Sequence, residues 1–270
     1  MSFMIKLNKV VLVFVLFFSF ANTYAQSHRI KPDNYFGVVF KPLIPLGIVG
    51  DKPFNMVNDE VDLFETKISP IFGYSYGATV RIGITKLLAI ETGLGFSKRR
   101  YRADYTLTKV DSLNNTSVLK TKDDIGFVNF DIPLNLLVYV QLGKQFYMNV
   151  SGGVSMNYYP SEIRSSWTPD EFKKDVFIFE GRRNAHINFN ANAEVGFEYR
   201  TDNIGIFYLG MAGRIPFSTI MDIATEYRYD VQSQVSYGKV DGATFALSIK
   251  YFFPNIKRDT EFERMQSPTN

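Results

Sequence analysis

The feature that most constrains this chain is a stretch of alternating side chains that runs from residue 124 to residue 160. Between residues 128 and 142 every even-numbered residue is apolar, while the odd-numbered ones include asparagine, aspartate and glutamine. A period of two residues places all the apolar side chains on one face of a β-strand. The pattern stops at residues 143–145 and resumes over residues 146–156. It therefore predicts a hairpin of two strands, each longer than the five or six residues usual in soluble proteins.

Alternation of this kind recurs along the chain and sets the fold class. We predict eight strands, over residues 35–48, 71–84, 88–105, 128–142, 146–157, 185–200, 204–215 and 240–253. Tilted strands of about 9–11 residues cross a bilayer, and eight strands make the smallest closed membrane barrel. The sequence therefore predicts an all-β fold, an eight-stranded antiparallel transmembrane β-barrel of the outer-membrane type.

The predicted connections are of two kinds. Turns after the second, fourth and sixth strands are short, whereas the other segments are long: residues 49–67, 110–123, 161–183 and 217–238. Short periplasmic turns and long outer loops are typical of outer-membrane barrels, so both termini are expected in the periplasm. The alternative is a soluble barrel of the lipocalin kind, because alternation does not say which face lies inside. Strand length, loop asymmetry and charged polar faces favour the membrane barrel.

The N-terminal residues indicate export. Two lysines precede an apolar run over residues 10–18, and small residues follow up to Ala25, which predicts a secretory signal peptide cleaved there. An uncleaved anchor is the alternative, although the run is shorter than the roughly twenty residues of a spanning helix. The predicted organisation is a signal peptide (residues 1–25), a short periplasmic segment (26–33), the barrel (34–254) and a disordered periplasmic tail (255–270).

Composition narrows the partners. The chain has no cysteine, so the sequence predicts neither a lipoprotein nor a disulfide. The formal net charge of +3 includes two lysines of the signal peptide, and a mature chain near neutrality gives no indication of a nucleic-acid partner. Aromatic residues make up 16% of the chain, as girdles at two membrane interfaces require. The expected surroundings are outer-membrane lipid and lipopolysaccharide, and the oligomeric state is left open.

Two short motifs support a family resemblance. Residues 129–136, Asn-Phe-Asp-Ile-Pro-Leu-Asn-Leu, and residues 150–154, Val-Ser-Gly-Gly-Val, resemble two strands of the Bacteroidetes outer-membrane β-barrel family that includes PorT-like proteins. The cleavage site at residues 25–26 is similar to signal peptides of that phylum. Some members of the family are implicated in type IX secretion, so the resemblance implies an envelope role. Residues 145–147, Gln-Phe-Tyr, replace the usual Pro-Tyr opening and depart from PorT itself.

An enzymatic role has one candidate residue. His186 is the only possible general base, because His28 lies at the predicted mature terminus. We expect His186 to face inward near the outer end of the sixth strand, beside asparagines. Without a recognisable triad it is interpreted as a hydrogen-bonded lumen residue. Metal binding is not indicated either, since cysteines and paired histidines are lacking. We therefore predict a non-enzymatic protein without cofactor, and keep an enzyme using His186 as an alternative.

Charged residues fall on the predicted inner face of the barrel. Unpaired charges in a narrow lumen are costly, and eight-stranded barrels are filled by their own side chains. The sequence therefore predicts a plugged barrel, with a small channel as the alternative. The expected lumen polar network consists of Lys41, Arg81, Glu91, Arg99, Asp131, Glu194, Glu198, Arg200, Arg214 and Lys250.

Recognition is expected in the long loops, because a wall between lipid and paired charges has little free surface. In the third loop, residues 165–174 predict a short helix with Thr168 as N-cap and Glu171 as its capping-box partner. Trp167 and Phe172 are the candidate partner-binding residues of this loop; the alternative, a common arrangement at helix N-termini, is that they pack together as a staple. The predicted role is an accessory, partner-binding or structural component of the cell envelope, with a protein secretion machinery as one candidate assembly.

Overall fold

The computed structural model describes residues 34–44, 54–57, 64–110, 116–168, 175–201, 203–229 and 232–254. The predicted signal peptide, the periplasmic segment at residues 26–33 and the tail at residues 255–270 lie outside these residues. Contacts divide the chain into residues 1–31 and residues 32–270, and everything described here belongs to the second unit. The described residues contain no helix that is long and apolar enough to cross a membrane.

Eight antiparallel strands form a closed ring, which confirms the predicted fold class. Each strand pairs with the next, and β1 pairs with both β3 and β13, which closes the ring. The strands, in ring order, are β1 (Tyr35–Ile44), β3 (Phe64–Gly83), β4 (Leu88–Val110), β5 (Thr116–Gln141), β6 (Phe146–Tyr158), β9 (Ile187–Thr201), β10 (Gly205–Pro216) and β13 (Thr244–Phe252).

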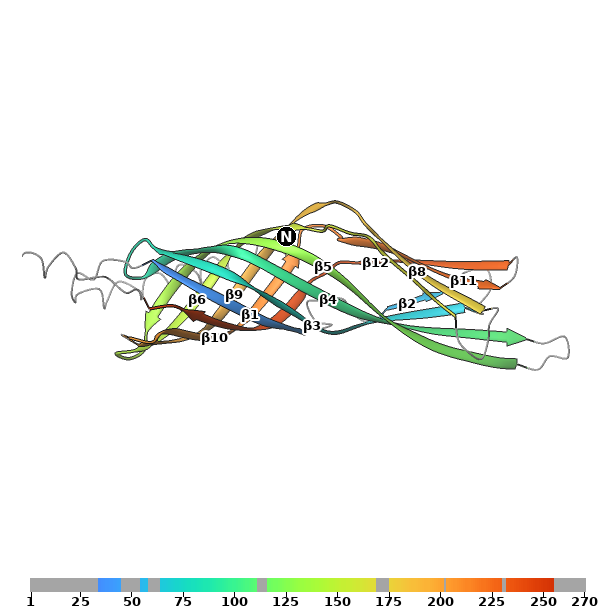
Figure 1. Ribbon diagram of the computed structural model, residues 1–270, viewed down its shortest axis with the longest axis horizontal. Helices are drawn as coiled ribbons and strands as arrows, with labels where there is room; N and C mark the ends of the chain where they lie inside the picture. The colour runs from blue at the N-terminus through green and yellow to red at the C-terminus, as the bar shows by residue number, and fades with distance from the viewer. Residues whose placement is uncertain are drawn as a thin grey trace, which may run out of the picture. The chain divides into compact units, whose positions relative to one another are not determined.

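The segments predicted as long loops are largely β-structure. Strands β3, β4 and β5 run on beyond the positions predicted for them, as Figure 1 shows. The short strand β2 (Phe54–Val57) pairs with the start of β3. A separate four-stranded sheet, in the order β12-β11-β8-β7, contains β7 (Ile163–Trp167), β8 (Asp175–Arg183), β11 (Met221–Tyr229) and β12 (Gln232–Val240). The predicted loops are therefore hairpins that prolong the barrel.

The prediction of a helix over residues 165–174 is wrong for the first of these residues. Ser165 and Trp167 lie in β7, which pairs with β8. Their side chains also contact β5, since Ser165 Oγ donates to Asp123 Oδ2 at 2.6 Å and Trp167 Nε1 donates to Thr121 Oγ1 at 3.0 Å. These tertiary contacts outweigh local helix propensity, which is a weak prior. Residues 169–174 lie outside the described residues.

The two faces of β4 exchange character partway along the strand. Its inward residues are small, polar or charged up to Arg99, and the inward residues that follow are the buried Tyr101, Ala103, Tyr105 and Leu107. The outward residues change in the opposite sense, from Leu94 and Phe96 to a run of charged residues. Strand β5 shows the same exchange at residues 127–129. We call this level the junction, the strands on the side of the short turns the barrel section, and the structure beyond it the β-module.

In β3 a bulge produces the exchange. Phe64, Thr66 and Ile68 are buried before the bulge, whereas Ser75 and Thr79 are buried after it, so the inward parity changes from even to odd. The register against β4 shifts between residues 71 and 74. An extra residue in one strand turns all the following side chains to the opposite face. Because of the bulge, the inward-facing side chains of β3 are the even-numbered ones before it and the odd-numbered ones after it.

The β-module has an apolar core between its two sheets. Phe64 lies against Tyr105, Phe177 and Tyr227, with ring centroids 6.3, 6.2 and 5.8 Å away. Burial, reinforced by the charge of Asp123, raises the pKa of Tyr105, so the phenol stays neutral in this core. The remaining buried members include Ile68, Tyr101, Ala103, Leu107, Ile125, Phe127, Tyr159, Phe179, Ile220, Met221, Ile223 and Val240. Buried aromatic contacts of this kind dominate core energetics, so the β-module is packed like a domain interior.

The outer face of the barrel section is an exposed apolar belt bounded by two rows of aromatic rings. Leu94, Leu134 and Leu209 are exposed by 58, 56 and 55%. Near the short turns the ring contacts join Phe36, Phe146, Phe197, Phe207, Tyr251 and Phe253. Near the junction they join Tyr74, Tyr76, Phe96 and Phe130. Soluble monomers rarely expose an apolar surface this continuous.

Candidate functional site

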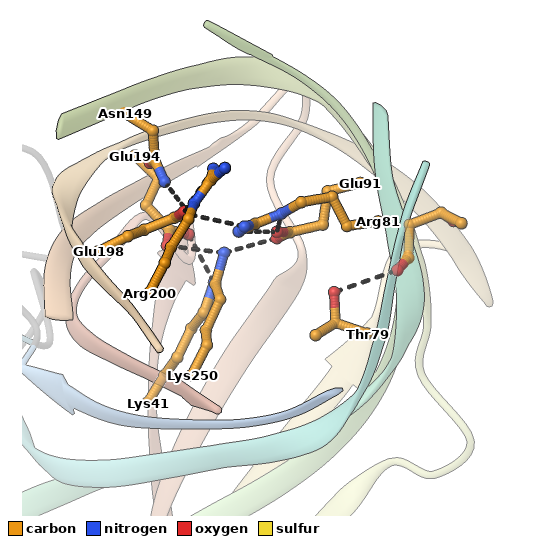
Figure 2. A network of polar contacts seen from close by, with 10 residues as sticks. Lys41, Thr79, Arg81, Glu91, Asn149, Glu194, Glu198, Arg200 and Lys250 are labelled. Atoms are coloured by element: carbon orange, nitrogen blue, oxygen red, sulfur yellow. Dashed lines mark hydrogen bonds and ion pairs between the residues drawn. The ribbon is translucent and has the colours of Figure 1, made fainter. Parts of the chain in front are cut away.

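A chain of alternating charges crosses the lumen of the barrel section, as Figure 2 shows. At one end Lys41 Nζ lies 2.9 Å from Glu194 Oε2. Lys250 Nζ joins the other oxygen of Glu194, at 2.8 Å, to Glu91 Oε1, at 2.5 Å. Arg81 continues the chain, since its NH2 lies 2.9 Å from Glu91 Oε2. In this half each carboxylate, Glu194 or Glu91, bridges two cations.

The second half of the chain reaches the short-turn end. Arg81 NH1 lies 2.6 Å from Glu198 Oε1, and Arg200 NH2 lies 2.9 Å from Glu198 Oε2. Asn149 Nδ2 also donates to Glu198, at 2.5 Å. These residues come from β1, β3, β4, β6, β9 and β13, so the chain of charges connects most of the wall of the barrel. Paired charges that link several strands in this way are expected to rigidify the barrel wall.

Aromatic rings cover the chain of charges. The guanidinium carbon of Arg81 lies 4.0 Å from the ring centroid of Phe252. Arg200 lies 4.7 Å from the ring of Tyr139 and 4.1 Å from that of Tyr147. Sequence analysis did not single out these rings, although Tyr139 and Tyr147 occupy inward positions of the alternation. The stacked rings add cation–π attraction to both arginines.

A second, smaller group lies nearer the junction. Arg214 NH2 is 3.0 Å from Asp131 Oδ2, and Ser97 Oγ donates to Asp131 Oδ1 at 3.4 Å. Arg99 donates from NH1 to the carbonyl oxygen of Gly242. All ten residues of the predicted lumen network face the lumen, and nine of them form ion pairs within the predicted set. The guanidinium of Arg99 also lies 5.9 Å from the ring of Phe127.

Between the two groups lies a cavity of about 60 Å³. Lys41, Glu91, Lys250, Asp131, Ser75 and Asn192 are among the residues that line it. A buried water occupies roughly 10–15 Å³ of such volume and needs polar partners, so the cavity suits a few waters. The lumen thus contains charge pairs and room for water.

Gly242 holds the backbone at the junction in a conformation that other residues rarely adopt, with φ of +78°. A Cβ at this position would lie 2.7 Å from Arg99 NH1 and would also clash with Ile220. We expect Gly242→Ala to lower the free energy of unfolding by about 1–3 kcal/mol. Gly213→Ala is the matched control, because a Cβ there meets nothing within 4 Å. Urea titration in lipid vesicles measures both, and equal stability of the two variants would contradict the expectation.

His186 does not face the lumen, so the expectation for its side chain is wrong. It is exposed, its ring stacks on Tyr158 at 6.4 Å, and its Nε2 lies 3.2 Å from Arg183 NH2. The residue precedes β9, so the inward parity of that strand does not extend to it. Neither Tyr158 nor Arg183 is a carboxylate that could orient the imidazole as a general base. Across the described part of the chain, no three histidine, aspartate or glutamate side chains are grouped as metal ligands would be.

Of the two candidate partner-binding residues, the structure describes Trp167. Its side chain is 43% exposed on β7, opposite Phe177 of β8 in the strand register. The bond from its indole nitrogen to Thr121 holds it against β5. Phe172 lies outside the described residues, and the predicted staple with it. Trp167 is thus an exposed ring at a fixed position rather than part of a free loop.

The strand order and the two faces define the class of the protein: a closed eight-stranded antiparallel β-barrel with an apolar exterior, a charged interior and strands prolonged into a second packed structure.

Solved structures with a similar fold are outer-membrane proteins. OprG from Pseudomonas aeruginosa matches with a TM-score of 0.45 and 15% identity over 83% of this chain and 96% of that one. AlkL in lipid bilayers matches with a TM-score of 0.42 and 14% identity over 87% of this chain and 97% of that one. The protease OmpT from Escherichia coli matches with a TM-score of 0.33 and 10% identity over 84% of this chain and 97% of that one. No protein-family model and no curated protein matches the chain. Similarity this low supports no transfer of activity, and the Bacteroidetes resemblance stays a prediction.

Proposed function

We propose that this protein is an integral outer-membrane β-barrel that holds a folded β-module at the cell surface and acts, without catalysis, as an accessory or partner-binding component of the envelope. The exchange of faces at the junction carries this proposal. In the barrel section the apolar side chains point outward, as a bilayer requires, and in the β-module they point inward, as water requires. The same strands thus suit lipid in the barrel section and water in the β-module.

The apolar belt supports the membrane location. On β5 the outward residues from Phe130 to Val140 are all apolar. This span of eleven residues is what a tilted strand needs to cross the hydrocarbon core. Aromatic rows at both borders correspond to the girdles of outer-membrane barrels.

The packing of the lumen favours a barrel that anchors the β-module over a barrel that acts as a channel. The ion pairs that cross the barrel section and the aromatic core of the β-module both support a closed lumen. Current recordings in planar bilayers should therefore show no large, steady conductance from the purified protein. Steady, large openings would support the small-channel alternative and contradict the proposal.

Orientation decides whether the β-module faces the cell surface. Cysteine substitutions give no background, because the chain has no native cysteine. With a membrane-impermeant maleimide on intact cells, we expect labelling of Ser166→Cys in β7 and none of Lys144→Cys in the turn before β6, since both side chains are exposed but at opposite ends. Both should react after cell lysis. Labelling of Lys144→Cys alone in intact cells would reverse the proposed topology.

Recognition by a partner is assigned to the exposed side of the β-module. Trp167 stands there on β7, held by Thr121, and Val118 of β5 is 55% exposed. Aromatic side chains on a rigid support are frequent anchors of protein interfaces. The resemblance to PorT-like proteins further supports an accessory role in a protein secretion machinery. Phe177 and Phe179 of β8 lie in the packed core, whereas Trp167 is exposed, so a substitution of Trp167 tests this surface without removing a core residue.

A further inference from the structure

The outward face of β4 carries three successive cations just beyond the junction. Lys98, Arg100 and Arg102 follow Phe96, which belongs to the aromatic row that borders the belt. At about 3.3 Å per residue, Lys98 lies about 7 Å along the strand from Phe96. If the belt spans the hydrocarbon core, these cations lie at the depth of the lipid headgroups.

The cations are drawn together by a carboxylate and a glycine on β5. Arg102 Nε lies 2.8 Å from Asp124 Oδ1, and Arg100 NH2 lies 3.2 Å from Asp124 Oδ2. Gly126 pairs with Arg100 in the register, and a Cβ there would lie 3.4 Å from Lys98 Cε and 3.7 Å from Arg100 Cγ. The stems of Lys98 and Arg100 therefore both pass beside the bare backbone of Gly126.

The cluster has an excess of positive charge. Asp124 pairs with Arg100 and Arg102, and Lys98 adds a third cation to the same face of β4. The neighbouring Asp104 and Lys122 lie opposite each other in the register and balance one another. The hydrogen bond from Arg102 lowers the pKa of Asp124, so this carboxylate stays ionised. The side chains of Arg100 and Arg102 are 41 and 39% exposed, and each guanidinium has five N–H donors. Donors thus remain accessible to an anion from outside.

We propose that Lys98, Arg100 and Arg102 bind the phosphate of a lipid headgroup in the surrounding leaflet. In the proposed orientation this is the outer leaflet, and the ligand class is a phosphorylated glycolipid of the lipopolysaccharide type. The inference rests on the proposed function for its membrane and its orientation. Guanidinium forks match phosphate oxygens in pairs, and the ammonium of Lys98 adds a point charge. A ligand that approaches in the membrane plane reaches this cluster directly from the belt.

The test compares lipids on the purified full-length protein in detergent. Native mass spectrometry should show that bisphosphorylated lipid A is retained and that its fully dephosphorylated form is not. In the double variant Arg100→Gln, Arg102→Gln, retention should weaken at least about tenfold, because charge-assisted hydrogen bonds are lost. Arg228→Gln is the matched control, since Arg228 is an exposed arginine of the β-module paired with Glu226. It should bind as the unmodified protein does.

Several outcomes would overturn the inference. Equal retention by the double variant, or of the dephosphorylated lipid, would mean that the cluster does not recognise phosphate. Displacement by inorganic phosphate at the concentration of the lipid would mean that the lipid is not the preferred source. Vesicle insertion and heat-modifiable migration report the proposed function separately. A protein that inserts without any preference for phosphorylated lipid contradicts this inference alone, whereas a protein that does not insert contradicts both.

Discussion

Arg81→Met is expected to lower the free energy of unfolding by about 3–5 kcal/mol, the cost of removing one partner from a buried ion pair. Arg81 is 1% exposed and lies between Glu91 and Glu198, at 2.9 and 2.6 Å. Methionine fills much of the volume but leaves Glu91 and Glu198 with one cation each in place of two. Lys250 and Arg200 still neutralise part of their charge. The measurement is urea unfolding in lipid vesicles, followed by heat-modifiable migration.

Two further variants separate charge from packing. Arg228→Met removes the partner of Glu226 in an exposed pair, and such pairs contribute about 0–1 kcal/mol. Combining Arg81→Met with Glu91→Gln and Glu198→Gln should recover part of the loss, because the stranded charges are then absent. If Arg81→Met unfolded at the same urea concentration as Arg228→Met, the chain of charges would not stabilise the barrel. Increased conductance of Arg81→Met in bilayer recordings would further identify Arg81 as part of the plug.

The barrel section was predictable because a period of two residues fixes which side chains share a face. The same rule placed the charged residues in the lumen, including Lys41 from β1 and Lys250 from β13, which are far apart in sequence but adjacent in the ring. Which cation meets which carboxylate was not predictable, because that depends on the stagger between strands. The cavity between the two charged groups depends on the same stagger.

The β-module was missed although its pattern is in the sequence. Residues 100–107, Arg-Tyr-Arg-Ala-Asp-Tyr-Thr-Leu, and residues 221–229, Met-Asp-Ile-Ala-Thr-Glu-Tyr-Arg-Tyr, alternate as regularly as the barrel strands do. In β4 the alternation passes through the junction without a shift, and only the chemistry of the two faces changes. The strands predicted from residues 71 and 128 begin near the exchange of faces, because one set of apolar side chains was expected for each strand, whereas the strand predicted over residues 88–105 already passes the junction. Local capping signals at residues 168–171 then favoured a helix over a hairpin.

His186 shows a different limit of the pattern. Its even number predicts an inward side chain only if β9 already includes it, and the strand begins at Ile187. Boundary residues are the least reliable part of such predictions, because fraying or a bend of one residue reverses the face. The position of His186 beside Tyr158 follows from that bend.

The β-module is expected to respond to core changes separately from the barrel section. Phe64 is fully buried and contacts three aromatic rings from both sheets, so Phe64→Ala should lower the stability of the β-module by about 3–5 kcal/mol. Trp167, the only tryptophan of the chain, lies in β7 and reports this part by its fluorescence. The lumen ion pairs involve no residue of that core, so heat-modifiable migration of the barrel section should change little.

The matched control is Tyr237→Ala on β12, where the side chain is 77% exposed, and its effect should stay within about 0.5 kcal/mol. Because strands β3, β4 and β5 are continuous through the junction, the independence of the two parts has to come from their separate packing rather than from a break in the backbone. In Phe64→Ala the fluorescence transition should therefore move to lower urea while the gel transition stays in place. If both transitions moved together, the junction would transmit unfolding, and the two parts would form one cooperative unit in spite of their opposite faces.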